Sequence, residues 1–292
     1  MKKRNIVEQT LLIVIFSVLC LAILFPFWLL VSASFSNSES IAVNGYQIWP
    51  KPFDLEAYKY VFKIPQQILR AYGVTFIFSV AAMFLSLILM AMIAYPLSRK
   101  GLKGRSAINF YLYFTMLFNG GLVPTYLLIA KTLHLNDTIW VYILPGLISP
   151  WYVFMMRTFF AGIPGEIVES ATIDGASEYT IFAKMILPLS KPVLATVALF
   201  IFLAKWNDWN TALIYITKPE LYSLQYLLQK IMEDINILKM NQDLSGMIDA
   251  ADMPTETMRM AMAVVVAGPA LIVFPFFQKY FVKGLTVGSV KG

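Results

Sequence analysis

Residues 165–192 read GEIVESATIDGASEYTIFAKMILPLSKP and form a polar, charged stretch between two long apolar runs. Carboxylates in its first turns favour a helix start, and Asp174-Gly175 suits a helix end because glycine readily adopts positive φ. Ser177 is expected to cap a second helix, which Pro188 would stop. The stretch therefore predicts a rigid helix–turn–helix loop that is too polar for lipid and presents a surface to a partner. A hairpin of no special use at the membrane interface stays open as the alternative.

The composition around this loop is that of a membrane protein. The chain has 292 residues, of which 59% are hydrophobic and only 14% charged, with a mean hydropathy of +0.68. Soluble domains carry about 25% charged residues, and one membrane crossing takes about 20 apolar residues. The sequence therefore predicts an all-α polytopic membrane protein with six transmembrane helices and the polar loop between spans four and five. The six runs are residues 10–34, 71–98, 107–131, 138–160, 191–213 and 255–281.

The distribution of charge predicts the orientation of these spans. With the N-terminus in the cytoplasm, the inside segments hold 13 of the 23 Lys and Arg residues but only five of the 17 Asp and Glu residues. This asymmetry satisfies the positive-inside rule and places both termini and the polar loop in the cytoplasm. The basic pI of about 9.2 is thus an orientation signal and does not indicate nucleic-acid binding.

The predicted organisation follows from these spans. It consists of a cytoplasmic N-terminus at residues 1–9, a transmembrane domain at 10–281 and a cytoplasmic tail at 282–292. Within the domain lie the cytoplasmic loop at 161–190 and an outer loop at 214–254. Apolar residues at helical spacing predict a short helix over 55–62 and an amphipathic helix over 221–235. The second helix either rests on the membrane or docks an extracellular partner.

Several kinds of site have no support in the sequence. The N-terminal apolar run is too long for the apolar region of a signal peptide, which spans roughly 7–15 residues, so it predicts a retained anchor. Cys20 is the only cysteine and His134 the only histidine, so no metal-ligand set is expected. The chain contains no G-x-x-x-x-G-K-[ST] phosphate loop and no nucleophile–base set. We expect no catalytic residue and no bound cofactor or metal.

Two regions within the spans carry polar residues that suit a transport pathway. Asn119-Gly120-Gly121 and Pro124 break the third span near the predicted bilayer midplane, and Pro145-Gly146 with Pro150 breaks the fourth. Broken backbone at that depth is tolerated only against protein or a water-filled cavity. Asn119 is therefore a candidate pathway residue, and close helix packing by small residues is the alternative. The fifth span ends in AKWNDWN, which adds the candidates Trp206, Asn207, Asp208 and Trp209. These residues line either an outer vestibule for a sugar or an aromatic belt with a local Lys205–Asp208 pair.

The spacing within the polar loop resembles the cytoplasmic loop of ABC importer permeases. The pattern of that family is Glu-Ala-Ala, three residues, Gly, nine residues and Ile-x-Leu-Pro. Here the matching residues are Glu169-Ser170-Ala171, Gly175 and Met185-Ile186-Leu187-Pro188, with Ser170 and Met185 as small departures. The chain also resembles the carbohydrate branch of that family, which contains relatives of the smaller maltose-permease subunit. This resemblance lies in residues 174–176, 188–192, 206–208 and 282–292. Residues 119–124 are similar to the polysaccharide-import and lipoprotein-associated permeases of Gram-positive bacteria.

This resemblance implies a cell-membrane, multi-pass subunit that forms half of the pathway of an ATP-driven importer for a carbohydrate such as an oligosaccharide. Its implied partners are a second, different permease subunit, two cytosolic ATPases that bind ATP and Mg, an extracellular solute-binding lipoprotein and membrane lipid. The host would be a Gram-positive bacterium. The ATPases would grip residues 166–188, and Ala171 and Gly175 are expected to contact them. The implied coupling residues are Glu166, Glu169, Ser170, Ala171, Asp174, Gly175, Ala176 and Pro188.

Two other classes of protein are alternatives to this one. A self-sufficient secondary transporter or channel usually carries ionisable groups near the midplane or internal repeat symmetry, and neither is clear in the sequence. An integral membrane enzyme would need a polar catalytic cluster, and none stands out. An importer subunit is expected to co-purify with a second permease and an ATPase.

Overall fold

A computed structural model of the chain describes residues 6–63, 65–240, 256–269, 271 and 275. The regular elements of this described part are helices, accompanied by an isolated antiparallel bridge between Ser36 and Phe53. The all-α prediction is thus confirmed for these residues. The chain divides into two compact units: unit 1 comprises residues 1–68 and 228–269, and unit 2 comprises residues 69–227 and 270–292.

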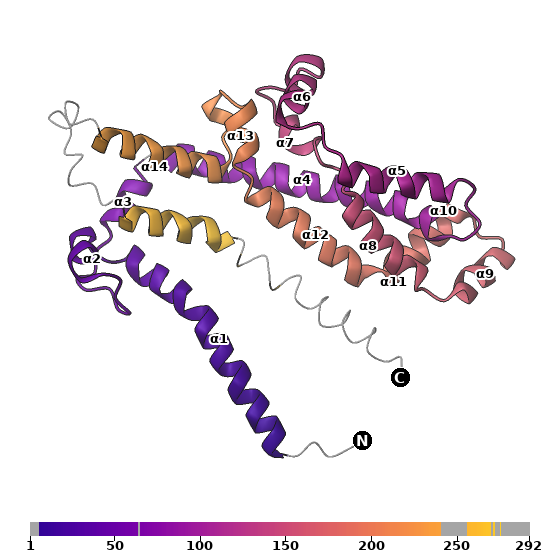
Figure 1. Cartoon of the computed structure of the whole chain (residues 1–292), viewed down its shortest axis with the longest axis horizontal. Helices are drawn as coiled ribbons and strands as arrows, with labels where there is room; N and C mark the ends of the chain where they lie inside the picture. Colours follow the sequence, from indigo (N-terminus) through magenta and orange to yellow (C-terminus); the bar gives the residue numbers. More distant parts are fainter. Residues whose placement is uncertain (1–5, 64, 241–255, 270, 272–274, 276–292) are drawn as a thin grey trace. The chain divides into compact units, whose positions relative to one another are not determined.

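Unit 1 begins with a long apolar helix, α1 (Ile6–Ser34), drawn in indigo in Figure 1. Its stretch Glu8–Ser34 qualifies as a membrane span, and none of the most apolar 18 residues of that stretch is buried by the described chain. A helix that is apolar on all sides must be covered by protein or lipid. Since the described residues cover only the end of α1 around residues 32–34, lipid or a partner subunit is expected to cover the rest.

The chain after α1 folds back onto the end of that helix. α2 (Ser38–Asn44) is capped by Asn37, whose Oδ1 accepts hydrogen bonds from the next turn. α3 (Glu56–Val61) confirms the short helix predicted here. The Tyr58 hydroxyl lies 2.9 Å from Ser34 Oγ, and the Tyr58 ring stacks on Phe35 at 4.9 Å. Unit 1 also contains a helical stretch over residues 256–269.

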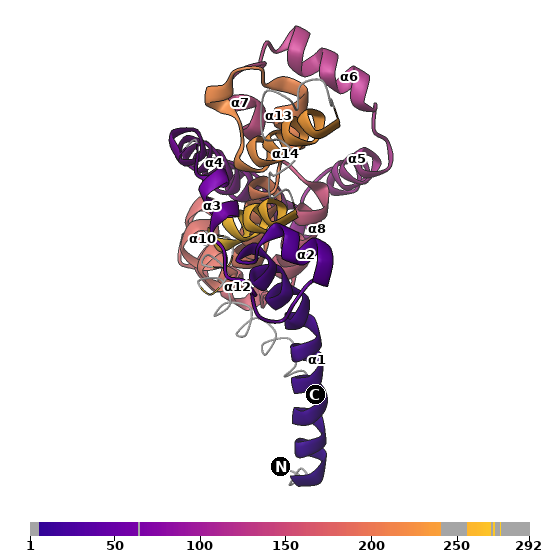
Figure 2. The same cartoon turned by 90° about the vertical axis from the view of Figure 1, so that its left-hand side faces the viewer.

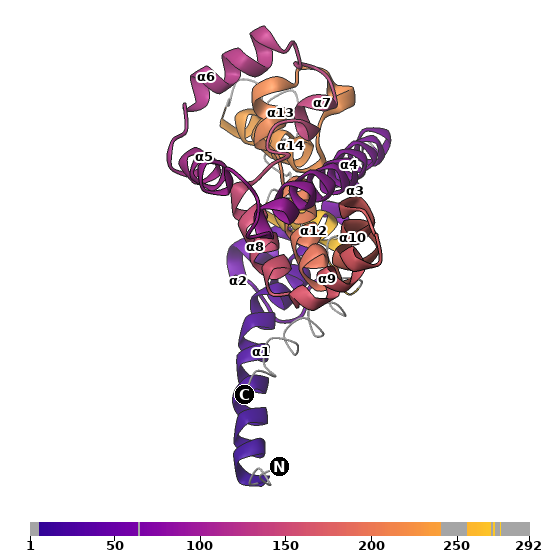
Figure 3. The ribbon, with the colours of Figure 1, turned by 90° about the vertical axis from the view of Figure 1, so that its right-hand side faces the viewer.

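Unit 2 is built along α4 (Pro65–Ser98) from residue 69 onward, and α4 is the second helix that qualifies as a membrane span. α8 (Pro150–Ala161) packs against both α5 (Arg105–Leu117) and α12 (Lys191–Trp206). α9 (Gly165–Ile173), α10 (Glu178–Ile181) and α11 (Leu187–Leu189) gather at one end of the unit (Figure 1). α6 (Leu122–Tyr126), α7 (Trp140–Ile143) and α13 (Asn210–Tyr215) gather away from that end, as Figures 2 and 3 also show.

The third and fourth predicted spans are each broken, at the positions where glycine and proline predict a break in the helix. α5 is followed after the break by α6 and the π-helical turn η1 (Leu127–Thr132), with a bend of 112° between the two parts. α7 and α8 are separated by residues 144–149, in which Gly146 adopts a φ of +77°. The predicted fifth span likewise ends early, because α12 stops at Trp206 before α13 begins.

The predicted count of six spans is not reached among the described residues. Two helices there are long and apolar enough to cross a membrane, or up to four if each bent helix pair forms one span. The fourth run fails because it is divided into two helices, and the sixth is described only in part, over residues 256–269, 271 and 275. The chain continues after α13 with the 3-10 turn η3 (Pro219–Leu221) and with α14 (Leu224–Met240), which confirms the helix predicted over 221–235.

Candidate functional site

The polar loop, residues 161–190 of unit 2, begins with a helix that has one buried and one exposed side. α9 starts directly after Pro164, and its buried residues Val168 and Ala171 are three positions apart, so they share one face of the helix. Between and beyond them, polar residues point to solvent. The exposed predicted site residues are Glu166, Glu169, Ser170, Asp174, Gly175 and Pro188, whereas Ala176 is half-buried.

A glycine turn ends α9, as the sequence predicts. Gly175 has a φ of +81°, and a Cβ built on it would meet no atom within 4 Å, so backbone conformation rather than crowding favours glycine. The N–H of Gly175 donates to the carbonyl of Thr172 at 3.0 Å, and the N–H of Ala176 donates to that of Ala171 at 2.9 Å. These two bonds make a Schellman motif, which fixes the direction in which the chain leaves α9.

The second helix of the loop begins at its predicted cap but does not stop at the predicted proline. Ser177 Oγ accepts a hydrogen bond from the N–H of Thr180 at the start of α10. α10 continues through a π-helical turn, η2 (Phe182–Ile186), into α11, and Pro188 lies inside that last short helix. The break comes at Ser190, where the chain bends by 78° into α12. The wider π turn directly before Pro188 accommodates a residue that would clash with a regular preceding turn.

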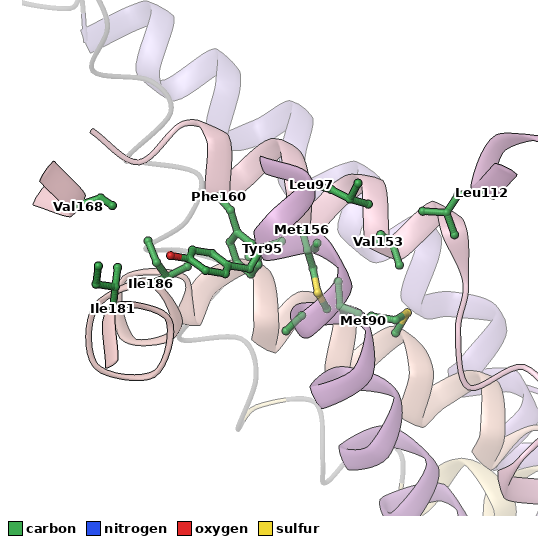
Figure 4. Close-up of a cluster of buried hydrophobic side chains, with 14 of the residues drawn as sticks. Met90, Tyr95, Leu97, Leu112, Val153, Met156, Phe160, Val168, Ile181 and Ile186 are labelled. Carbon is green, nitrogen blue, oxygen red and sulfur yellow. The ribbon is translucent and has the colours of Figure 1, made fainter. Parts of the chain in front are cut away.

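The underside of the polar loop is part of the hydrophobic core of unit 2. Val168 and Ala171 of α9 and Ile181 and Ile186 of the second helix belong to a buried cluster that also contains Tyr95 of α4. Figure 4 shows Ile186 beside the Tyr95 ring. Ala171 is only 3% exposed, so its methyl group is covered by the chain itself. Its predicted role in coupling would have to act through packing, because direct contact with a partner needs an exposed side chain.

The outer side of the polar loop leaves two large side chains open to solvent. Ile173 is 86% exposed and Tyr179 is 81% exposed, one on either side of the glycine turn. They are accompanied by the exposed carboxylates of Glu166, Glu169 and Asp174. Apolar and aromatic groups flanked by charged ones are typical of protein interfaces. This side has the chemistry of a protein-docking surface.

Residues that the sequence analysis did not single out connect the loop to α4. The Tyr95 hydroxyl donates a hydrogen bond to Glu178 Oε2, and Arg99 donates one to the Tyr95 oxygen at 3.0 Å. Tyr95 and Glu178 are 83 positions apart. Arg99 follows Tyr95 by one helical turn, but no local sequence signal indicates a partner so far along the chain.

The α12–α13 corner, residues 205–211 of unit 2, contains the other group of predicted site residues. Trp206 is only 2% exposed and stacks on Phe202 at 5.6 Å. Asn207 is exposed, and its amide donates to the carbonyl of Leu203 and accepts from Gln225. Trp209 is 39% exposed. Of this group, Asn207 and Trp209 therefore keep surface that a ligand could reach.

The charged residues of this corner use their polar atoms within unit 2. Lys205 Nζ donates to the backbone carbonyls of Tyr142 at 2.6 Å and of Pro145 at 3.2 Å, at the break between α7 and α8. Asp208 accepts hydrogen bonds from the N–H and the hydroxyl of Thr211, so it caps α13. Lys205 and Asp208 are not among the direct ion pairs of the described residues, and the aromatic belt stays open as the alternative to a vestibule.

Asn119 lies apart in the sequence, at the bend between α5 and α6. Its Oδ1 accepts a hydrogen bond from the N–H of Gly121 at 2.8 Å, and Gly121 has a φ of +88°. No atom of the described chain lies within 4 Å of a Cβ built on Gly121. Within this chain the glycine therefore serves the turn and not close helix packing, and Asn119 both stabilises the turn and stays exposed.

The chain is similar to known transport proteins over nearly its whole length. The family model described as "Binding-protein-dependent transport system inner membrane component" matches residues 3–287. Protein LplC of Bacillus subtilis is 40% identical over 267 residues, which cover 91% of this chain and 89% of LplC. The polygalacturonan/rhamnogalacturonan transport system permease protein YtcP of the same species is 38% identical and aligns over 96% of both chains.

A solved structure has the same fold. It is a chain from the crystal structure of a bacterial ABC transporter involved in the import of the acidic polysaccharide alginate. The two chains superpose with a TM-score of 0.79 at 28% identity, and the match covers 96% of this chain and 99% of the other.

Proposed function

The chain belongs to the family of binding-protein-dependent transport system inner membrane components, and from that premise we propose that the polar loop is where its ATPase docks. The chain is thus a multi-pass permease subunit of an ABC importer and is not itself catalytic. A binding-protein-dependent system implies a binding protein, an ATPase and a partner permease subunit. Family membership decides against a self-sufficient transporter or channel.

The observation that carries the docking proposal is the exposed side of the loop. Ile173 and Tyr179 are more than four-fifths exposed on a segment whose opposite side is buried. Large side chains this exposed carry a cost in hydration free energy, which a partner surface would remove. The Schellman turn and the Ser177 cap keep the two helices in a defined arrangement, so a force on the surface would move the loop as one body.

The predicted coupling residues divide between two roles in this proposal. The carboxylates of Glu166, Glu169 and Asp174, together with Ser170, supply charge and hydrogen bonds to cationic and polar groups of the ATPase. The remaining residues shape the loop. Gly175 and Ala176 form the turn, Ala171 anchors α9 to the core, and Pro188 lies in the last helix before the bend into α12.

We propose an oligosaccharide as the cargo, because YtcP and the transporter of the solved structure are named for polysaccharides. The complete importer would contain a second, different permease, two cytosolic ATPases that bind ATP and Mg, and a lipid-anchored binding protein outside the cell. This chain would contribute six spans with both termini in the cytoplasm. The two Bacillus relatives support a Gram-positive host.

The proposed contacts with the sugar come from the α12–α13 corner and from the bend after α5. Asn207 and Trp209 keep accessible surface and offer an amide and an aromatic face, which are the groups that recognise sugar hydroxyls and ring faces. Trp206 and Asp208 would position them, since Trp206 is buried against Phe202 and Asp208 caps α13. Asn119 would contribute an exposed amide from the broken third span.

The docking proposal is tested by cross-linking in the intact importer. In a chain carrying Cys20→Ser, Ile173→Cys is labelled with a maleimide that bears a photoreactive benzophenone. The complex is then illuminated. We expect a cross-linked product with the ATPase subunit, because residue 173 lies on the proposed surface.

A matched variant controls for labelling at random. Ala171→Cys lies two positions away on the buried side of α9 and is expected to give little product. An active complex in which Ile173→Cys reacts with lipid or with the other permease, and not with the ATPase, would show the proposal to be wrong.

A further inference from the structure

A hydrogen-bonded chain of three side chains ties the polar loop to the end of α4. The Glu178 carboxylate accepts from the Tyr95 hydroxyl, whose oxygen in turn accepts from Arg99 at 3.0 Å. Glu178 is the first residue of α10, directly after the turn that joins the two helices of the loop. Tyr95 and Arg99 are one turn apart in α4 and its continuation. The chain thus joins the exposed half of the loop to a membrane-spanning helix.

The surroundings hold the Tyr95 hydroxyl in place between its two partners. The guanidinium of Arg99 lies 4.9 Å from the centre of the Tyr95 ring, and the Phe182 ring lies 5.1 Å from it. Phe182 belongs to η2, so the loop touches Tyr95 at two points. These contacts restrict rotation of the phenol and favour one direction for its O–H bond.

The charges make separation of the loop from α4 unfavourable. The Nε of Arg99 is buried and has no hydrogen-bond partner among the described residues. The hydroxyl of Tyr95 links this partly desolvated cation to the negative charge of Glu178. Glu178 is exposed and Arg99 is half-buried, so solvent screens the attraction between their charges. The two charge-assisted hydrogen bonds through Tyr95 are the directional part of the contact. If the loop moved alone, Arg99 would lose its counter-charge, so α4 is expected to follow.

The remaining contacts between the loop and α4 are less directional. Val168, Ile181 and Ile186 meet the core through apolar surface, which can slide at small energetic cost because dispersion contacts have no preferred angle. A pocket of about 760 Å³ lies beside the three side chains and is lined by Leu102 and Tyr179 among others. Because packing is open on this side, the hydrogen bonds of Tyr95, Arg99 and Glu178 are well placed to fix the position of the loop relative to α4.

We propose that Tyr95, Arg99 and Glu178 form a latch that makes α4 follow the polar loop when the ATPase moves it. They are positioning residues, which convert displacement of the loop into displacement of a pathway helix. The inference rests on the proposed docking function. It adds the route by which movement of the docked ATPase is transmitted to a membrane-spanning helix.

The test measures coupling in the whole importer reconstituted in proteoliposomes. Tyr95→Phe removes the hydroxyl and keeps the ring against Arg99 and Phe182. We expect assembly and ATPase activity close to those of the unmodified importer. Sugar taken up per ATP hydrolysed should fall roughly tenfold, the scale of one lost hydrogen bond to a charged group. Tyr111→Phe, a hydroxyl removal on the exposed side of α5, is the matched control and should leave the ratio unchanged.

A second variant makes the result independent of how well Tyr95→Phe folds. Glu178→Ala breaks the latch from the loop side and should give a similar fall in the uptake-to-hydrolysis ratio. If the residues act as one unit, the double variant falls no further than either single variant. Two results would contradict the proposed latch. One is a double variant whose loss in the ratio equals the product of the two single losses, and the other is a normal ratio in both single variants. Cross-linking of Ile173→Cys to the ATPase in these variants separates this outcome from failure of docking itself.

Discussion

The polar loop and the α12–α13 corner both contain charged and aromatic residues, but these face solvent in the loop and are largely bonded or packed within the chain in the corner. In the loop, the large side chains of Ile173 and Tyr179 face solvent on a stiff scaffold. In the corner, Lys205 and Asp208 satisfy backbone groups of unit 2, and Trp206 is buried. The loop therefore keeps its surface for a partner, whereas much of the polar chemistry of the corner maintains the fold.

Residue type alone therefore does not identify a site in this protein. Trp206, Asn207 and Asp208 are adjacent in the sequence, but they differ in burial and in hydrogen-bond partners. Lys205 is half-buried and donates to two carbonyls at a helix break, where it replaces hydrogen bonds that the broken helix lacks. Substitutions in the loop should thus affect coupling, and substitutions of Lys205 should affect stability.

The largest effect is expected at the glycine turn of the loop. Gly175→Val places a β-branched residue at a φ of +81°, where side-chain-bearing residues lose about 1–2 kcal/mol. Relaxation of this strain would change the angle between α9 and α10. We expect uptake to be abolished while the protein remains in the membrane, as measured by transport assay and immunoblot. Gly175→Asn is the control, because asparagine tolerates this conformation, and it should retain most of the uptake. Full uptake by the valine variant would contradict a role of the turn in coupling.

An intermediate effect, on stability, is expected at the corner. Lys205→Met preserves most of the side-chain volume and leaves the carbonyls of Tyr142 and Pro145 without their donor. We expect a loss of about 2–3 kcal/mol, seen as a lower melting temperature of the purified complex.

Trp209→Ala supplies the contrast within the same corner. Its ring is 39% exposed, so this variant should melt almost normally and raise the KM for uptake. A normal melting temperature of Lys205→Met would contradict the role of Lys205 in stability. Normal transport by Trp209→Ala would contradict the proposed contact between Trp209 and the sugar.

The smallest effect is a pH dependence near the corner. Hydrogen bonds from Thr217 and Lys218 hold the pKa of Asp137 below its ordinary value of 3.8. A lowered pKa in the folded state means that the carboxylate stabilises the fold above its ordinary pKa, and that this contribution disappears as pH falls through the folded value. Between about pH 5 and pH 3, the unmodified protein should therefore lose slightly more thermal stability than Asp137→Asn. Asparagine also suits the φ of +53° at this position. Equal losses in both proteins would show that the contact has no influence on stability.

Local features of the fold were predictable from the sequence. The helix end at Gly175, the cap at Ser177 and the breaks around Gly121 and Gly146 were all placed correctly. Each depends on hydrogen bonds or backbone angles within a few residues, so the neighbouring residue types suffice to predict it. The stop at Pro188 was placed two residues early, because a π turn accommodates the proline ring.

Long-range contacts were decided only by the tertiary structure. The partners of Lys205 lie 60 and 63 positions away, and Glu178 is 83 positions from Tyr95. The burial of Ala171 likewise depends on where α9 packs. The sequence by itself determined the family, the helical elements and the polar character of the loop, since these follow from composition, spacing and local hydrogen bonding. Which polar groups are satisfied internally and which stay open depended on the packing of helices distant in sequence, and local patterns carry no information about those partners.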